Sequence, residues 1–240
     1  MSHPDTVVYL EHDGRVLLVN NNGEGPKLPV KGRQDQSEII RFPTIDEVAE
    51  FGISYEQKMD IRIVFGNQVI RVIKAYPKIE WPEHWAMKDN LVSDNCVHPV
   101  AREAIYRSVH RLVSKVVIRN DRNEILMAKV KRGHFTGFWT LPGGYMDHDE
   151  HPTMGCVRET LEELGIEIVL DENPPTITQQ IFNDEGISFV SFTYQSTWNG
   201  EKSDMNLLTE EISDAAWFSK DEAINNAVSY FDLEAIRSVD

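Results

Sequence analysis

One stretch of the chain, residues 143–166, constrains the fold more than any other because it predicts a helix with both of its ends. Pro152 suits the first position of a helix, where its missing N–H is not needed. Gly165 suits the left-handed position that commonly ends a helix. The sequence therefore predicts a helix from about Pro152 to Leu164.

Three glutamates share one face of this helix. Glu159, Glu162 and Glu163 stand at positions i, i+3 and i+4, so their carboxylates project together. Like charges at this spacing destabilise a bare helix, and a divalent cation among the oxygens would remove the repulsion. Oxygen-only ligands favour Mg²⁺, with Mn²⁺ as a substitute, over zinc. A solvated acidic helix face is the alternative interpretation.

The spacing around the glutamates resembles the Nudix box, GX5EX7REUXEEXGU, in which U is a bulky aliphatic residue. The matching positions are Gly144, Glu150, Arg158, Glu159, Glu162, Glu163, Gly165 and Ile166. Thr160 departs from the pattern at the first aliphatic position and touches no proposed ligand. The resemblance implies a Nudix fold over residues 113–240, an α/β (α+β sandwich) architecture with a mixed β-sheet between helices.

The resemblance also implies roles for residues. The metal ligands would be Glu159, Glu162 and Glu163 together with the carbonyl of Gly143, and Glu163 could also orient or deprotonate the attacking water. Glu150 is a weaker candidate ligand that could instead pair with Arg158. Family members often take a further catalytic glutamate from a loop before the last strand.

Glu210 and Glu211 both fit the location of that further glutamate, six or seven residues before Trp217, and Glu211 is the one we assign. A surface loop charge is the alternative interpretation.

Substrate contacts are expected from the segment that precedes the box. Cations on this segment could meet phosphate oxygens, and its aromatic side chains could stack on a base. The candidate cations are Lys129, Lys131, Arg132 and His134, and the candidate aromatic residues are Phe135, Phe138, Trp139 and Tyr145, although Trp139 is better placed to pack under the loop. Of these, Lys129, Arg132, Phe138 and Tyr145 form the predicted substrate-binding set.

The flanking patterns predict two domains. Apolar residues recur at helical spacing from Pro99 to Leu112, which indicates an amphipathic connecting helix. We therefore expect an N-terminal domain over residues 1–112 and a catalytic domain over residues 113–240. Strand patterns mixed with a few helices indicate an α+β or α/β layered fold in the second half.

The N-terminal half resembles a degenerate copy of the second half. Leu28-Pro29 lies 113 residues before Leu141-Pro142, and Gly52 lies 113 residues before Gly165. An unrelated α/β module is the alternative. A non-catalytic domain before a Nudix domain is similar to the arrangement in NADH pyrophosphatases, although the four zinc-binding cysteines of those enzymes are absent here. Two roles are open for the N-terminal domain: it could form a homodimer interface, or it could cover the active site.

Charge is unevenly distributed along the chain, whose net charge is -15. Residues 1–140 hold 20 basic and 18 acidic residues, whereas residues 141–240 hold 4 basic and 21 acidic residues. Such a balance disfavours nucleic acid and anionic membranes as partners. The two cysteines cannot form a disulfide framework, and no apolar run is long enough to span a membrane. We expect a cytoplasmic location.

The leading prediction is a Mg²⁺-dependent pyrophosphohydrolase that cleaves the pyrophosphate of a nucleoside diphosphate linked to another group. ADP-ribose and a dinucleotide such as NADH are the first candidate substrates. The alternative from another class is a sensor or regulatory protein that uses the same fold to bind nucleotides without hydrolysis. The complete set of carboxylates disfavours that alternative, because binding alone does not require them. Within the hydrolase class, RNA decapping and the removal of mutagenic nucleotides stay open.

Overall fold

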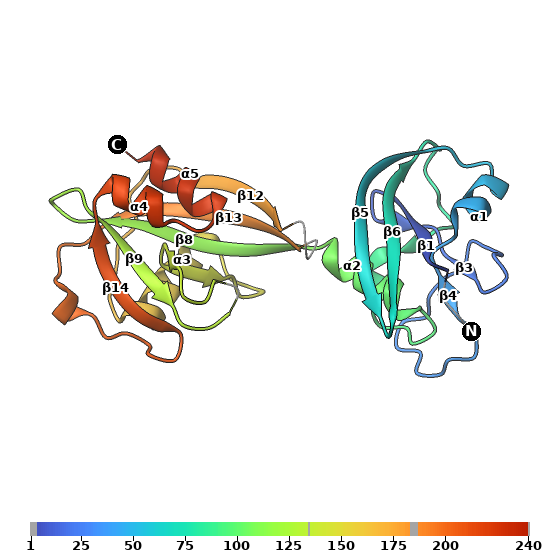
Figure 1. Cartoon of the computed structure of the whole chain (residues 1–240), viewed down its shortest axis with the longest axis horizontal. Coiled ribbons are helices and arrows are strands. Elements are labelled where there is room, and N and C mark those ends of the chain that lie inside the picture. Colours follow the sequence, from blue (N-terminus) through green and yellow to red (C-terminus); the bar gives the residue numbers. More distant parts are fainter. Residues whose placement is uncertain (1–3, 134, 183–186, 240) are drawn as a thin grey trace. The chain divides into compact units, whose positions relative to one another are not determined.

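The computed structural model describes residues 4–133, 135–182 and 187–239. The chain divides into two compact units, Met1–Val109 and His110–Asp240 (Figure 1). The boundary falls three residues before the one expected from the sequence. Each unit has its own sheet, its own helices and its own apolar core.

The N-terminal unit is built on a five-stranded sheet in the order β5-β6-β1-β2-β7. Strands β1 and β6 are parallel, and the other neighbours are antiparallel. A separate two-stranded sheet pairs β3 with β4. The strands are β1 (Thr6–His12), β2 (Arg15–Val16), β3 (Val19–Asn20), β4 (Ile40–Arg41), β5 (Tyr55–Phe65), β6 (Gln68–Pro77) and β7 (Ala86–Met87).

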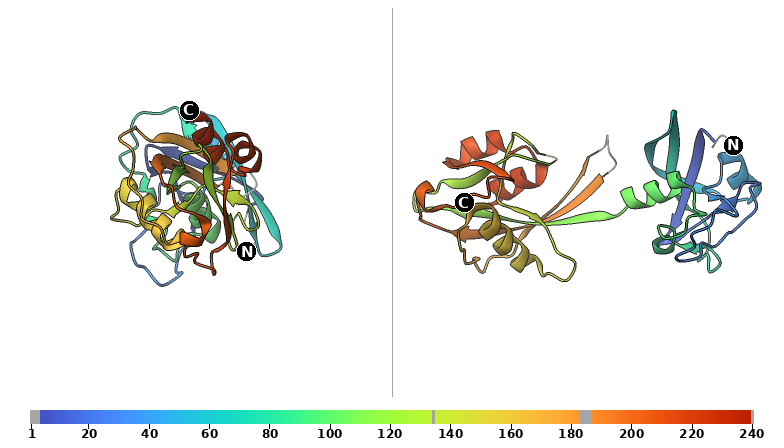
Figure 2. Two further views of the ribbon diagram at one scale, coloured as in Figure 1. Left: turned by 90° about the vertical axis from the view of Figure 1, so that its left-hand side faces the viewer. Right: turned by 90° about the horizontal axis from the view of Figure 1, so that it is seen from below.

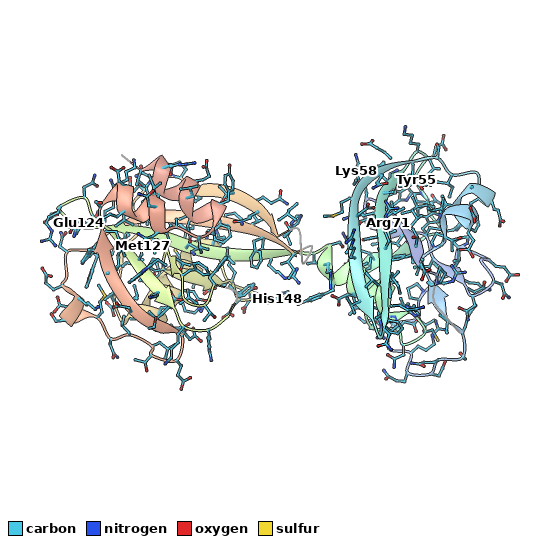
Figure 3. All side chains as sticks on the ribbon, in the orientation of Figure 1. Tyr55, Lys58, Arg71, Glu124, Met127 and His148 are labelled. Carbon is cyan, nitrogen blue, oxygen red and sulfur yellow. The ribbon has the colours of Figure 1, made fainter. Side chains whose placement is uncertain are left out.

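Alternation along β1 divides the N-terminal core into two layers, because successive side chains of a strand point to opposite faces. Val7 and Tyr9 pack into the cluster that contains α2 (Pro99–Arg107), while Val8 and Leu10 pack into the cluster that contains Val48 of α1 (Ile45–Glu50). A short 3₁₀ helix, η1 (Lys88–Asn90), follows β7. Figure 3 labels Lys58 on β5 and Arg71 on the neighbouring β6.

The C-terminal unit is built on a seven-stranded sheet whose main path runs β10-β9-β8-β13-β12, with β11 on β8 and β14 on β9. Strands β8 and β13 are parallel. The strands are β8 (His110–Arg119), β9 (Ile125–Val130), β10 (Trp139–Thr140), β11 (Gly143–Tyr145), β12 (Thr176–Phe182), β13 (Ile187–Thr197) and β14 (Ile212–Phe218).

Helices cover both faces of this sheet. Val116 and Ile118 of β8 pack with Cys156 and Leu164 of α3 (Pro152–Leu164), whereas Val117 packs on the opposite face. That face is covered by α4 (Lys220–Asn226) and α5 (Tyr230–Ser238), as Figures 1 and 2 show. A 3₁₀ helix, η2 (Lys202–Asp204), precedes β14. The expected layered fold, a mixed sheet between helices, is confirmed.

The expectation of a long connecting helix was wrong at its end. Helix α2 ends at Arg107, and residues 110–112 already belong to β8. The reason is tertiary: His110 pairs with Ser188 of β13, so the chain is extended where its apolar spacing still favours a helix.

None of the helices in the described part of the chain has the length and apolar character needed to cross a membrane.

Candidate functional site

Helix α3 begins and ends where its sequence predicts. The His151 side chain accepts a hydrogen bond from the Thr153 N–H, and Pro152 occupies the first turn. Gly165 ends the helix at φ 69°, and a Cβ there would lie 2.7 Å from the Cβ of Asn206. Both the backbone angle and the close approach therefore require glycine.

Two glycines let strand β11 lie against the carboxylates of α3. The Gly143 N–H donates to Glu163 Oε2 at 3.1 Å. A Cβ on Gly143 would lie 2.3 Å from the Ser114 carbonyl oxygen, and one on Gly144 would lie 2.7 Å from the Glu159 carboxylate. Glu159 and Glu163 therefore approach a segment of backbone where no side chain would fit.

The carboxyls of Glu159 and Glu163 sit in surroundings that disfavour negative charge. The pKa of Glu163 is raised to about 8, chiefly by burial; the nearby carboxylates of Glu159 and Glu211 contribute to the rise, while the Gly143 N–H and Lys115 oppose it. Burial also raises the pKa of Glu159, against the effect of Arg158. A bound cation would stabilise the charged forms of both groups.

Arg158 organises the acidic residues around it. Its guanidinium donates to both carboxylate oxygens of Glu150, at 2.9 and 3.0 Å, and to Glu159 at 3.1 Å and Glu162 at 2.9 Å. It also donates to the carbonyl oxygen of Tyr145 at 3.1 Å. The pairing with Arg158 lowers the pKa of Glu150. Glu150 is thus committed to Arg158, and Glu162 is exposed at the edge of the cluster.

The donor set of this cluster is compatible with a hard divalent cation, since it consists of carboxylate and main-chain oxygens. Within the described residues, however, no three His, Cys, Asp or Glu side chains are grouped so that they could hold a metal ion as they stand. The Glu162 carboxylate accepts a hydrogen bond from Arg158 at 2.9 Å. The closest fit to a cation site is the pair Glu159 and Glu163 beside Gly143 and Gly144.

A cavity of about 200 Å³ opens beside Gly143, Gly144 and Glu163. Of the residues predicted to bind substrate, Arg132 and Tyr145 line it, and Lys129 and Phe138 do not. The Lys129 ammonium lies 5.8 Å from the centre of the Trp139 ring, and Phe138 is exposed.

Arg132 is also paired with Glu211, so the structure brings the predicted extra glutamate to the rim of this cavity. His134 lies outside the described residues. Glu124 and His148, labelled in Figure 3, mark opposite ends of the unit. The cavity is remote from the turn at Glu124, because β11 pairs with the first half of β8.

Sequence reasoning missed five residues that form the deeper part of this region. Lys115, Thr140, Phe189 and Phe231 line the cavity, and Asp232 lies behind Lys115. One signal was available: Lys115 is the one charged residue in the buried part of β8, residues 113–118, and Asp232 is the one charged residue on the buried side of α5. Buried charges of this kind are rare unless they are paired.

Comparison with known proteins gives one family match. Residues 109–237, more than half of the chain, match the model of the NUDIX domain. A MutT-like protein of Streptomyces ambofaciens is 24% identical over 140 residues, which are 58% of this chain and 83% of that protein. An 8-oxo-dGTP diphosphatase of Proteus vulgaris is 28% identical over 90 residues, which are 38% of this chain and 79% of that protein.

Solved structures also resemble this chain. A MutT NUDIX hydrolase from Burkholderia pseudomallei has a TM-score of 0.46 and 24% identity, and the match covers 55% of this chain and 100% of the other. The NUDIX domain of Shewanella oneidensis NrtR, complexed with ADP ribose, has a TM-score of 0.45 and 17% identity, with coverage of 54% and 86%.

Proposed function

The chain belongs to the Nudix hydrolase family, and we propose that it is a metal-dependent pyrophosphohydrolase acting on a nucleoside diphosphate linked to another group. One observation carries the proposal. Glu159 and Glu163 lie against the glycine pair of β11 beside a partly aromatic cavity of about 200 Å³, so a pair of carboxylates suited to a cation and a hollow suited to an aromatic ring adjoin each other.

We assign Mg²⁺ to the acidic site, with Mn²⁺ as a substitute. Glu159, Glu163 and the Gly143 carbonyl would hold the ion, and Glu162 would join them after turning away from Arg158. Glu150 is the weaker candidate, because Arg158 already engages both of its oxygens. When bound, the cation neutralises phosphate oxygens and lowers the pKa of water.

The side chains of this chain have distinct tasks in the reaction. Glu163 would accept a proton from the attacking water, since a carboxylate held beside the cation can act as a general base. Glu211, held by Arg132 at the cavity rim, is the second candidate for this role. Arg158 is a positioning residue: it fixes Glu159 relative to the Tyr145 carbonyl and so relative to β11. The exposed Arg132 meets phosphate oxygens, and Tyr145 covers the substrate.

Two substrate groups come first in a test. ADP-ribose and NADH represent nucleoside diphosphates linked to another group. Nucleoside triphosphates come second, because a relative is named an 8-oxo-dGTP diphosphatase and another is named MutT-like. Homodimer formation and a cytoplasmic location remain predictions from the sequence.

The experiment screens these nucleotides with Mg²⁺ in ¹⁸O-labelled water and identifies the products by mass spectrometry. We expect hydrolysis at the pyrophosphate, loss of turnover on addition of a chelator, and a fall of about 10²- to 10⁴-fold in kcat for Glu163→Gln. Glu167→Gln is the matched control, since Glu167 is an exposed glutamate just beyond the same helix.

Tight nucleotide binding without any product would instead favour a sensor or regulatory protein. Turnover that is unaffected by both Glu162→Gln and Glu163→Gln would contradict the assignment of the acidic site.

A further inference from the structure

The cavity beside the acidic site has aromatic walls of unequal exposure. Phe189 and Phe231 are 7% and 2% exposed and form its inner part, with ring centres 6.5 Å apart. Tyr145 is 59% exposed and lies 5.9 Å from Phe189, so it forms the outer part. A partly open cavity with aromatic walls suits a flat aromatic ring such as a nucleobase.

A charged pair lies at the bottom of this pocket. The Lys115 ammonium is 2.8 Å from Asp232 Oδ1 and 3.1 Å from Asp232 Oδ2, and it lies 5.3 Å from the centre of the Phe231 ring. The Lys115 side chain is 5% exposed, and that of Asp232 is fully buried. Asp232 also accepts the N–H of Leu141 at 3.3 Å.

Stability alone does not account for this pair. A buried ion pair is often no more stabilising than apolar side chains of the same volume. What the pair does provide is a fixed orientation, because Asp232 binds the ammonium from behind while Lys115 lines the cavity. The pair therefore directs a hydrogen-bond donor at whatever occupies the pocket.

Of the two paired side chains, Lys115 presents hydrogen-bond donors to the cavity, and Asp232 presents no acceptor to it. An ammonium has three N–H donors and no acceptor, and the carboxylate of Asp232 does not line the cavity. Guanine presents two neighbouring acceptors, O6 and N7, on one edge. Adenine presents an amino donor in place of O6, so it would set a donor against the Lys115 ammonium.

We propose that Lys115 is a specificity-determining residue, which selects a 6-oxopurine base such as guanine over adenine by donating to its O6 and N7 edge. This inference rests on the proposed function, because it assumes that the cavity holds the nucleoside part of the substrate. It ranks guanine nucleotides above the adenine nucleotides that are the first candidates from the sequence.

The first experiment measures binding of GMP, IMP and AMP by isothermal titration calorimetry without divalent metal. GMP and IMP both carry O6, and AMP does not. We expect the wild-type protein to bind GMP and IMP at least about tenfold more tightly than AMP. Equal binding, or tighter binding of AMP, would overturn the proposal.

The second experiment removes the pair without leaving an isolated charge, using the double variant Lys115→Gln/Asp232→Asn. A glutamine amide both donates and accepts, so the GMP-to-AMP ratio should fall to within about threefold through loss of GMP affinity. The matched control is Lys202→Gln/Asp214→Asn, an exposed ion pair in the same unit, which should keep the wild-type ratio.

A phosphate contact is the competing role for Lys115, since its charge also lowers the pKa of Glu163. In that case the double variant would weaken GMP and AMP equally, which would contradict base selection. Thermal unfolding checks that the variant is folded; if it is not, the comparison of GMP, IMP and AMP on the wild-type protein still decides.

Binding without metal separates this inference from the proposed function. If the protein prefers GMP but hydrolyses no nucleotide, the proposed enzymatic activity is contradicted and base selection is not. Hydrolysis combined with equal binding of GMP and AMP would overturn base selection alone.

Discussion

The two units share the order of five sheet strands and differ in the length of the helix that precedes the long hairpin, β5–β6 in one unit and β12–β13 in the other. Strands β5-β6-β1-β2-β7 of the N-terminal unit correspond to β12-β13-β8-β9-β14 of the C-terminal unit. In both, the third strand pairs in parallel with the second and antiparallel with the fourth. This agreement favours the interpretation that the N-terminal unit is a degenerate copy.

The helices are where the chemistry diverges. Helix α1 has 6 residues and α3 has 13, because Pro43 and the capping box of Thr44 and Glu47 start α1 late. The Glu47 carboxylate accepts the Thr44 N–H as part of the capping box. It also accepts hydrogen bonds from Arg41 on both oxygens, at 2.7 and 2.8 Å. A fold of this type therefore does not by itself provide a metal site.

Carboxyl pKa values shift in opposite directions at Glu47 and Asp94 of the N-terminal unit and at Glu159 and Glu163 of the acidic site. The hydrogen bonds from Arg41 lower the pKa of Glu47. Burial would raise that of Asp94, yet hydrogen bonds from Arg33 and two backbone N–H groups lower its pKa to about 2. In the C-terminal unit burial raises the pKa of Glu163 to about 8. At Glu47 and Asp94 hydrogen bonds to arginine outweigh burial, whereas at Glu159 and Glu163 burial outweighs the hydrogen bonds, as is common at functional sites.

The largest expected effect comes from Glu163→Gln set against Glu47→Gln. The first should lower kcat about 10²- to 10⁴-fold and leave the free energy of unfolding unchanged or higher, because it removes a poorly solvated carboxyl. The second should cost about 1–3 kcal/mol of stability and leave kcat unchanged, because it breaks an internal ion pair. Steady-state kinetics and urea unfolding check both, and the reverse pattern would break the comparison.

Arg158→Lys is the next test. A lysine cannot donate to Glu150, Glu159 and Glu162 at once, since it lacks the planar guanidinium fork. We expect about a tenfold fall in kcat/KM and a higher Mg²⁺ concentration for half-maximal activity. Arg237→Lys, an exposed arginine paired with Glu234, is the control and should change neither quantity.

Acid should lower the free energy of unfolding by protonating Asp94 of the N-terminal unit. Its pKa is lower in the folded protein than in the unfolded chain, so its contribution is fully present above about pH 5 and is lost as the pH falls toward 2. The side chain is fully buried, and the contribution is on the order of 2 kcal/mol. Urea unfolding at pH 6 and pH 3 measures it. An Asp94→Asn variant with the same pH dependence as the wild type would argue against this role.

The smallest effect compares two glycines that follow the helices. Gly52 and Gly165 have φ values of 68° and 69°, so alanine at either position costs about 1–2 kcal/mol of backbone strain. A Cβ on Gly52 meets open space, whereas one on Gly165 would lie 2.9 Å from the Asn206 carbonyl oxygen. Gly165→Ala should therefore lower the free energy of unfolding more than Gly52→Ala. Equal losses would show that the loop at Asn206 adjusts.

Local signals in the sequence predicted α3 to the residue. Proline at its first turn and glycine at its end act through φ angles and steric limits, which depend on neighbours in the chain. The same local reasoning placed the helix end of α2 too late, at Leu112 instead of Arg107. There the pairing of His110 with Ser188 decides the conformation, and no pattern near residue 110 reports a partner so far away.

The sequence by itself determined the family, the helix and the spacing of its carboxylates, because that chemistry lies within 24 consecutive residues. Only the tertiary structure decided which carboxyls are buried beside β11, which are tied to Arg158, and what forms the pocket. Lys115 and Asp232 lie 117 positions apart and meet because α5 packs on the face of β8 that carries Lys115. Burial and charge pairing depend on such packing, so they belong to the fold and not to any one segment.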